Sequence, residues 1–268
     1  MSVSRSIPAN EVVRCHRPLV FLAEWDSRSV DTSPGTTFQW QLGGGQINLN
    51  VNAAVYDIDL TEAKDSDIST LHSRGRKVIC YFSAGTWEDY RHDVSGLPQS
   101  VLGNRLENWP HERYWDIRAQ AVRDVIRGRL DLAKQRGCDA VDPDNVDSYA
   151  NNNGLRLTRT DQLFFNKWLA GEAHTRGLSV GLKNAVDLVQ ELEPSFDWAL
   201  NEGCVHYNEC GVYQAFLSHN KAVFHVEYVD NHNQGASKRT SVCNSPHRPV
   251  GFTSLIKDWD LTDWYIAC

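Results

Sequence analysis

The chain has 268 residues, 41% of them hydrophobic, and carries a formal net charge of −7 at pH 7. This length suits a single α/β barrel domain, and the hydrophobic content allows a sizeable core. The negative charge argues against nucleic acid or an anionic membrane as a partner, because either would require a basic surface, and it favours a neutral or cationic ligand.

Eight runs rich in Val, Ile, Phe, Trp and Tyr predict β-strands. In chain order they cover residues 37–42, 53–58, 77–82, 138–142, 178–182, 196–200, 222–227 and 250–256. Helices are predicted between most of them. The stretch 65–75 ends in a glycine cap, and 158–177 opens with a Thr–x–x–Gln capping box at Thr158 or with Thr160 as N-cap. The stretch 119–137 has one apolar face, made of Val122, Val125, Ile126, Leu130 and Ala133.

Apolar strands that alternate with amphipathic helices indicate a parallel sheet covered by helices. Eight such strands predict an α/β fold of the (β/α)8 TIM-barrel type, as one domain over residues 1–268 in which 1–36 form an N-terminal extension packed on the barrel. An open doubly wound sheet is the alternative, but no GxGxxG motif follows the first strand. The first two strands are joined without a helix, and a long insertion, 83–118, follows the third strand.

Polar residues fall at the end of every predicted strand, and in a barrel these ends open onto the face where active sites gather. Any single one has a structural explanation, because loops are polar and aspartates cap helices. Asp139 and Asp147 are expected to be structural in this way. The ring as a whole favours a functional site. Its members are Trp40, Gln41, Asp57, Asp59, Tyr81, Ser83, Asp142, Asp144, Lys183, Asn184, Asn201, Glu202, Glu227, Tyr228, Lys257 and Asp258.

Many carboxylates at one mouth suggest two chemistries. A divalent metal would need converging oxygen ligands, often with histidine. None of the candidate histidines lies in a tight His–carboxylate motif: His92, His174, His206 and His225. Glycoside hydrolysis needs one protonated and one ionised carboxyl group. The nine tryptophans and nine tyrosines would supply platforms for sugar rings, so they favour the second chemistry, and we expect neither a metal nor a cofactor.

The cysteines bear on the compartment. Seven are present, without a CxxC pair, so a structural zinc site is not expected. Cys80 and Cys138 lie in apolar runs and are interpreted as buried thiols. Cys204 and Cys210 flank a short loop and are predicted to lie close enough for a disulfide, which would imply an oxidising compartment. The start MSVSRSIPAN lacks the apolar segment of a signal peptide, as would a mature secreted protein given a new initiator methionine.

Several long blocks resemble, in order, the signature blocks of glycoside hydrolase family 114, the endo-α-1,4-polygalactosaminidases. They are VYDIDL, KVICYFSAGTWEDYR, WPHERYWDIR, GCDAVDPDNVDSY, EAHTRGLSVGLKN, ALNEGC and VEY. The resemblance implies a (β/α)8 barrel and an endo-acting glycosidase. Its partner would be a cationic amino-sugar polysaccharide, α-1,4-linked galactosamine in partly deacetylated exopolysaccharide. We expect a secreted monomer.

The resemblance also implies site residues. Asp144 of PDN and Glu202 of NE would be the catalytic pair, with Asp144 as nucleophile or base and Glu202 as acid, or the reverse. The expected substrate-binding residues are Trp40, Asp57, Asp59, Tyr81, Asp142, Lys183, Asn184, Glu227 and Tyr228. Lys183 either keeps a neighbouring carboxylate ionised or only pairs with it structurally. Two other functions stay open, a carbohydrate-binding barrel without activity and a metal-dependent hydrolase.

Overall fold

The computed structural model describes residues 33–268. Most of the predicted N-terminal extension, 1–36, therefore lies outside the described residues, as does Cys15. The barrel strands are β1 (Phe38–Gln41), β2 (Val55–Asp59), β3 (Lys77–Ser83), β7 (Ala140–Asp144), β8 (Ser179–Lys183), β9 (Trp198–Glu202), β10 (Val223–Val229), β11 (Phe252–Asp258) and β12 (Ile266–Ala267). The first eight of these match the eight predicted strands.

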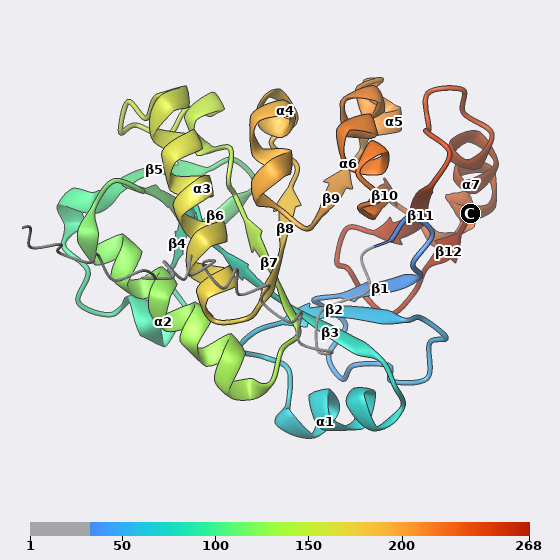
Figure 1. The fold of residues 1–268 in the computed structure, drawn as a ribbon, viewed down its shortest axis with the longest axis horizontal. Coiled ribbons are helices and arrows are strands. Elements are labelled where there is room, and N and C mark those ends of the chain that lie inside the picture. Colours follow the sequence, from blue (N-terminus) through green and yellow to red (C-terminus); the bar gives the residue numbers. More distant parts are fainter. Residues whose placement is uncertain (1–32) are drawn as a thin grey trace, which may run out of the picture.

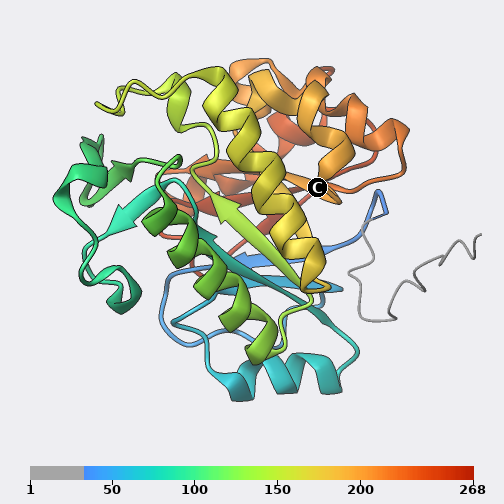
Figure 2. The same cartoon turned by 60° about the vertical axis from the view of Figure 1, so that its left-hand side comes forward.

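One curled sheet carries the fold (Figure 1). Its nine strands run in the order β1-β2-β3-β7-β8-β9-β10-β11-β12. Neighbouring strands from β1 to β11 pair parallel, and β12 pairs antiparallel with β11. The helices follow the sheet around its outside, as Figure 2 also shows. The fold is therefore the predicted α/β barrel of TIM type, and no helix lies between β1 and β2, as predicted.

The barrel closes between β1 and the C-terminal segment through hydrogen bonds outside the regular ladder. Gln39 Nε2 donates to the carbonyl of Asp263 at 3.0 Å, and the Leu42 amide donates to the carbonyl of Leu261 at 3.1 Å. Large side chains fill the interior, where the rings of Phe38 and Phe224 lie 4.6 Å apart across the barrel. The interior is a packed core beneath the mouth, as is usual for this architecture.

Three helices lie within the three predicted stretches: α1 (Asp65–Ser73), α2 (Gln120–Arg136) and α3 (Arg159–Thr175). The other helices, for which no bounds were predicted, are α4 (Val189–Leu192), α5 (Cys204–Tyr207), α6 (Gln214–Ser218) and α7 (Gly235–Cys243). Thr158 caps α3 in a capping box, but its partner is Asp161 and not the predicted glutamine, because Asp161 is the residue three positions on.

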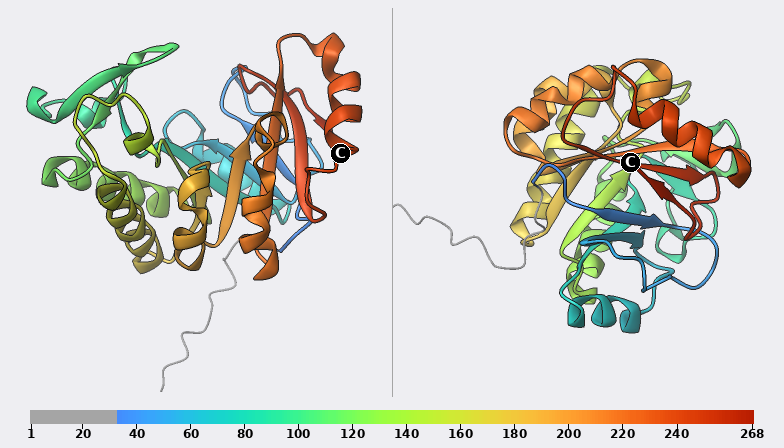
Figure 3. Two further views of the ribbon diagram at one scale, coloured as in Figure 1. Left: turned by 90° about the horizontal axis from the view of Figure 1, so that it is seen from above. Right: turned by 90° about the vertical axis from the view of Figure 1, so that its right-hand side faces the viewer.

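The predicted insertion after β3 forms a sheet of its own. Its strands are β4 (Thr86–Glu88), β5 (Leu102–Leu106) and β6 (Trp109–Trp115), in the order β4-β6-β5. Arg129 of α2 is buried and holds the start of this segment: its guanidinium donates to the Ser83 carbonyl at 2.6 Å and to Asp93 at 2.7 Å. Figure 3 (left) shows the inserted sheet on the opposite side of the barrel from α7.

Three disulfides join the cysteines of the described residues. Cys204–Cys210 confirms the predicted pair, and Cys243–Cys268 ties α7 to the C-terminus. The interpretation of Cys80 and Cys138 as buried thiols is wrong, since they are bonded to each other. Both lie in apolar surroundings, where a thiol and a half-cystine bury equally well, so composition could not separate them. None of the described helices is long and apolar enough to cross a membrane.

Candidate active site

A cavity of about 680 Å³ lies over the C-terminal ends of the strands. Strand ends from β1 to β10 form its floor, and the inserted sheet contributes Glu88, Glu112 and Tyr114. Of the predicted site residues, the following line it: Trp40, Asp59, Tyr81, Asp144, Lys183, Asn184, Glu202 and Tyr228. The residues predicted at the strand ends therefore lie around one cavity, except Asp57, Asp142 and Glu227.

Lys183 lies at the centre of the floor. Its ammonium is 3.4 Å from Asp142 Oδ2, 3.6 Å from Asp144 Oδ1 and 3.7 Å from Glu202 Oε2. It also sits 4.4 Å from the ring centroid of Trp40, a cation–π contact. Burial alone would lower the pKa of Lys183, but these carboxylates outweigh it and raise the pKa above its ordinary value. The ammonium thus fills the point where the carboxylates converge, which a bound cation would otherwise occupy.

Asp144, the last residue of β7, receives several hydrogen bonds. The Tyr81 hydroxyl donates to Oδ2 at 3.0 Å, and the Asn145 amide donates to Oδ1 at 2.8 Å. Asn145 has a left-handed backbone with φ of 58°, which turns the chain sharply after the strand. Gly85 packs against this turn so closely that a Cβ there would lie 1.8 Å from the Asn145 carbonyl oxygen. The turn therefore requires glycine in the SAGTWED segment.

Glu202, the last residue of β9, is held by a second set of donors. Asn184 Nδ2 donates to Oε2 at 2.8 Å, the Tyr228 hydroxyl donates to Oε1, and the Glu202 amide donates back to Asn184 Oδ1 at 2.9 Å. Asn184 adopts φ of 46°, a conformation that asparagine tolerates better than most residues. The Tyr213 hydroxyl fixes this turn by donating to the Asn184 carbonyl at 2.9 Å. Both carboxylates thus have a defined orientation toward the cavity.

An aromatic platform borders Glu202. The rings of Tyr228 and Trp259 stack with centroids 4.2 Å apart, and Trp259 is 61% exposed. Both residues and Glu202 also line a neighbouring cavity of about 800 Å³, together with His206, Tyr207 and Lys238 among others. Exposed stacked rings beside a carboxylate form a surface that suits a sugar ring. Trp259 directly follows Asp258, the last residue that the sequence predicts at the end of the eighth strand.

Three predicted substrate contacts do not line the cavity of about 680 Å³. Asp57 and Asp142 are fully buried beneath Lys183 and do not line the cavity. Glu227 borders the neighbouring cavity of about 800 Å³ but is only 1% exposed; it pairs with Lys238 at 2.8 Å and accepts hydrogen bonds from the amides of Val205 and His206. Burial would raise the pKa of Glu227, but these partners, with His225, lower it to about 2.

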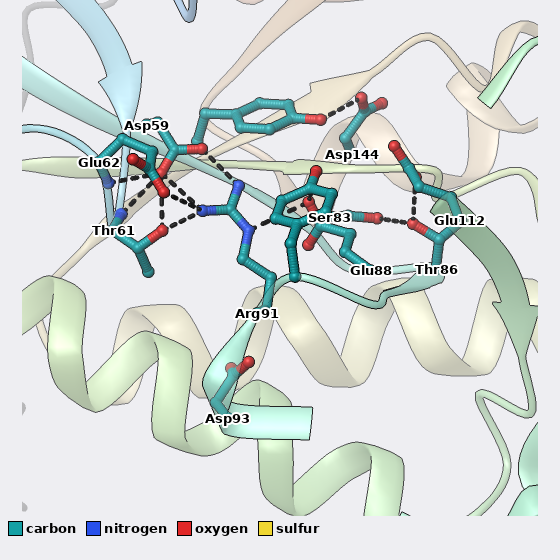
Figure 4. A network of polar contacts seen from close by, with 12 residues as sticks. Asp59, Thr61, Glu62, Ser83, Thr86, Glu88, Arg91, Asp93, Glu112 and Asp144 are labelled. Carbon is teal, nitrogen blue, oxygen red and sulfur yellow. Dashed lines mark hydrogen bonds and ion pairs between the residues drawn. The ribbon is translucent and has the colours of Figure 1, made fainter. Parts of the chain in front are cut away.

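Asp59 belongs to a network that joins the barrel to the inserted sheet (Figure 4). Arg91 pairs with Asp59 at 2.5 Å and with Glu88 at 3.2 Å. Burial would raise the pKa of Asp59, and the Arg91 contacts lower it below its ordinary value. Asp59 is therefore an ionised structural partner that also borders the cavity.

Glu112 of β6 is a cavity carboxylate that the sequence reading missed. It accepts a hydrogen bond from the Thr86 hydroxyl at 2.7 Å, as Figure 4 shows. Burial and the nearby Glu88 and Asp144 raise the pKa of Glu112 to about 7. The only sequence signal was its place in the WPHERYWDIR block. Because β6 is not a barrel strand, Glu112 does not lie at the end of a predicted barrel strand, where site residues were expected.

Among the described residues, Cys204, Cys210 and His225 lie close enough together to hold a metal ion. The two cysteines form a disulfide, so their sulfurs are not thiolates and are poor metal ligands.

Comparison with known proteins gives the fold and the family. A model of glycoside-hydrolase family GH114 matches residues 22–268. The structure of Ega3 from Aspergillus fumigatus in complex with galactosamine is 40% identical, with a TM-score of 0.83 over 89% of this chain and 97% of that chain. The glycoside hydrolase domain of PelA from Pseudomonas aeruginosa is 14% identical, with a TM-score of 0.66 over 88% and 98% of the two chains, and shares the fold. No curated protein matches the chain.

Proposed function

Because the chain belongs to glycoside-hydrolase family GH114, we propose that it is an endo-acting glycosidase of α-1,4-linked galactosamine in partly deacetylated exopolysaccharide. The observation that carries this proposal is the arrangement of Asp144 and Glu202, two partly exposed carboxylates that share the ammonium of Lys183 in one cavity. Glycoside hydrolysis requires such a pair. The Ega3 structure with galactosamine supports an amino sugar as the substrate unit.

The charge of the cavity also supports a cationic substrate. Its lining includes the basic residues Arg91 and Lys183, both paired with carboxylates. The acidic residues that line it are more numerous: Asp59, Glu62, Glu88, Glu112, Asp144, Asp147, Glu202 and Asp260. A deacetylated galactosamine unit carries an ammonium group, which the excess of negative charge in the cavity attracts. Affinity should therefore fall as salt rises, because ions screen exposed charges.

We assign Asp144 as the ionised nucleophile or base and Glu202 as the acid. Lys183 and a tyrosine hydroxyl contact both groups, so the assignment rests on the remaining donors. Asp144 Oδ1 accepts a hydrogen bond from the Asn145 backbone amide, a donor that cannot turn away, whereas Glu202 accepts hydrogen bonds only from the side chains of Asn184 and Tyr228. Lys183 and Asn184 position the two groups, and Tyr228 with Trp259 would stack against a sugar ring.

Three disulfides fit an oxidising compartment, so we also propose that the protein acts outside the cell.

Incubation of the purified protein with polygalactosamine, followed by mass spectrometry of the products, tests the proposal. The expected result is a series of short galactosamine oligomers that appears equally in the presence of EDTA. An inactive binding protein would retain the polymer without shortening it. Loss of activity with EDTA would instead favour a metal-dependent hydrolase. An intact polymer under conditions where the protein is folded would refute the proposal.

A further inference from the structure

Two aspartates beneath the active site have no role so far. Asp57 lies in the middle of β2 and Asp142 in β7, on either side of β3, and both side chains are fully buried. Within the described part of the chain, neither oxygen of Asp57 receives a hydrogen bond, nor does Oδ1 of Asp142. Asp142 has Lys183 at 3.4 Å, whereas no basic group lies within ion-pair distance of Asp57 among the described residues.

An ionised Asp57 would be costly in this position. A buried carboxylate without hydrogen-bond donors loses the solvation that stabilises its charge. Its neighbours from the packed strands are Asp142 and Asp144 of β7, which repel a negative charge, and Lys183 of β8, which Asp142 already engages. Burial and Asp142 raise the pKa of Asp57 well above its ordinary value. Asp142 Oδ1 is likewise buried without a hydrogen-bond partner among the described residues, so a proton on Asp57 would supply the donor that this oxygen lacks.

We propose that Asp57 is a protonated positioning residue whose O–H donates to Asp142 and keeps Asp142 ionised against Lys183. This inference rests on the proposed function. Asp142 and Lys183 then cancel in charge, and Asp144 and Glu202 are left to share the one proton that acid catalysis needs. Asp57 touches no substrate; it acts through Asp142, which anchors the ammonium beneath both catalytic carboxylates.

Two substitutions of Asp57 separate this role from a structural one. Asp57→Asn keeps a neutral donor of nearly the same shape, so its pH profile of kcat/KM on polygalactosamine should superimpose on that of the wild type. Asp57→Val fills the space without a donor. It leaves the Asp142 charge without its donor, so Asp142 offsets less of the Lys183 charge. The ammonium then favours the ionised form of the catalytic acid, and the alkaline limb of the profile should move to lower pH by on the order of one unit, the usual size of a lost charge interaction.

Asp142→Asn provides the matched comparison. It removes the charge that anchors Lys183, so kcat should fall by roughly tenfold, while Asp57→Asn stays within about twofold of the wild type. A displaced profile for Asp57→Asn would show that this substitution removes a charge, and would overturn the proposal. If Asp57→Val does not fold, the contrast between Asp57→Asn and Asp142→Asn still decides.

Infrared difference spectroscopy of wild type against Asp57→Asn gives a readout that needs no activity. At neutral pH the wild type should show the carbonyl band of a protonated carboxylic acid, and the band should be missing from Asp57→Asn. Absence of that band from the wild type would overturn the proposal. A wild type that shows the band but leaves the polymer intact would refute the proposed function alone.

Discussion

Replacement of Lys183 by methionine tests how the charged floor of the cavity contributes to stability. The ammonium lies 3.4 Å from Asp142 Oδ2, and at an effective dielectric constant of about 20 this corresponds to an attraction of about 5 kcal/mol. Removal of one partner from a buried pair usually costs about 3–5 kcal/mol, because the other charge is left alone. Methionine keeps an unbranched side chain beside Trp40, so the loss is mainly one of charge.

The deficit should depend on pH. Burial raises the pKa of Asp142 to about 6 although Lys183 lowers it, so loss of Lys183 raises it further. A raised folded-state pKa contributes stability that is present at low pH and is lost as pH rises through that pKa. The free energy of unfolding of Lys183→Met should therefore fall short by about 3–5 kcal/mol at about pH 7.5, or roughly 10 °C in Tm, and by less than half of that at about pH 5.

Urea unfolding followed by tryptophan fluorescence measures both values, and Lys257→Met serves as the control. Lys257 is also fully buried, but its ammonium donates to the Thr262 carbonyl and has no carboxylate within ion-pair distance among the described residues. Burial lowers the pKa of Lys257 to about 8, which is still above both pH values. Lys257 is therefore mainly charged at both, and its replacement should lower the free energy of unfolding by the same amount at each. An equal deficit at both pH values for Lys183→Met would refute the reasoning.

Further predictions concern the site and the disulfides. Asp144→Asn and Glu202→Gln should each lower kcat on polygalactosamine at least roughly a hundredfold while the polymer still binds in a pull-down, the scale of a lost acid–base group. The pKa of Glu112 is raised to about 7, so its contribution to the free energy of unfolding is present at low pH and is lost as pH rises from about 4.5 through 7. Glu112→Gln does not titrate. Its free energy of unfolding in urea, measured relative to that of the wild type, should therefore rise by about 1–3 kcal/mol between about pH 4 and about pH 8. Double replacement of Cys80 and Cys138 by serine should cost about 4 kcal/mol, because their disulfide closes a loop of 58 residues; an unchanged urea midpoint would contradict this.

The barrel could be predicted because each strand carries its own local signal. Apolar β-branched runs separated by capped amphipathic helices leave few other arrangements. The depth of each strand-end residue could not be predicted in the same way. Asp57 and Asp59 point to the same side of β2, but Asp57 lies two residues, or about 7 Å, further from the mouth. That distance separates a buried carboxyl group from one that borders the cavity.

Contacts made by non-barrel segments were equally hidden. Glu112 reaches the cavity only because β6 folds back over the mouth, and Trp259 only because the chain turns after β11 to stack it on Tyr228. Both placements depend on loop geometry, which has no periodic signal in the sequence. The pairing of Cys80 with Cys138 likewise depends on β3 and β7 lying side by side, a consequence of the closed fold.

The inserted sheet forms one wall of the cavity and is separate in the chain from the barrel strands. It is a single uninterrupted piece of chain between β3 and α2, and it supplies Glu88, Glu112 and Tyr114 without contributing to the barrel ladder. Arg129, which donates a hydrogen bond to the Ser83 carbonyl at the start of this segment, belongs to helix α2 of the barrel. A longer or different segment at this place would therefore change one wall of the cavity and leave unchanged the strands that hold Asp144 and Glu202.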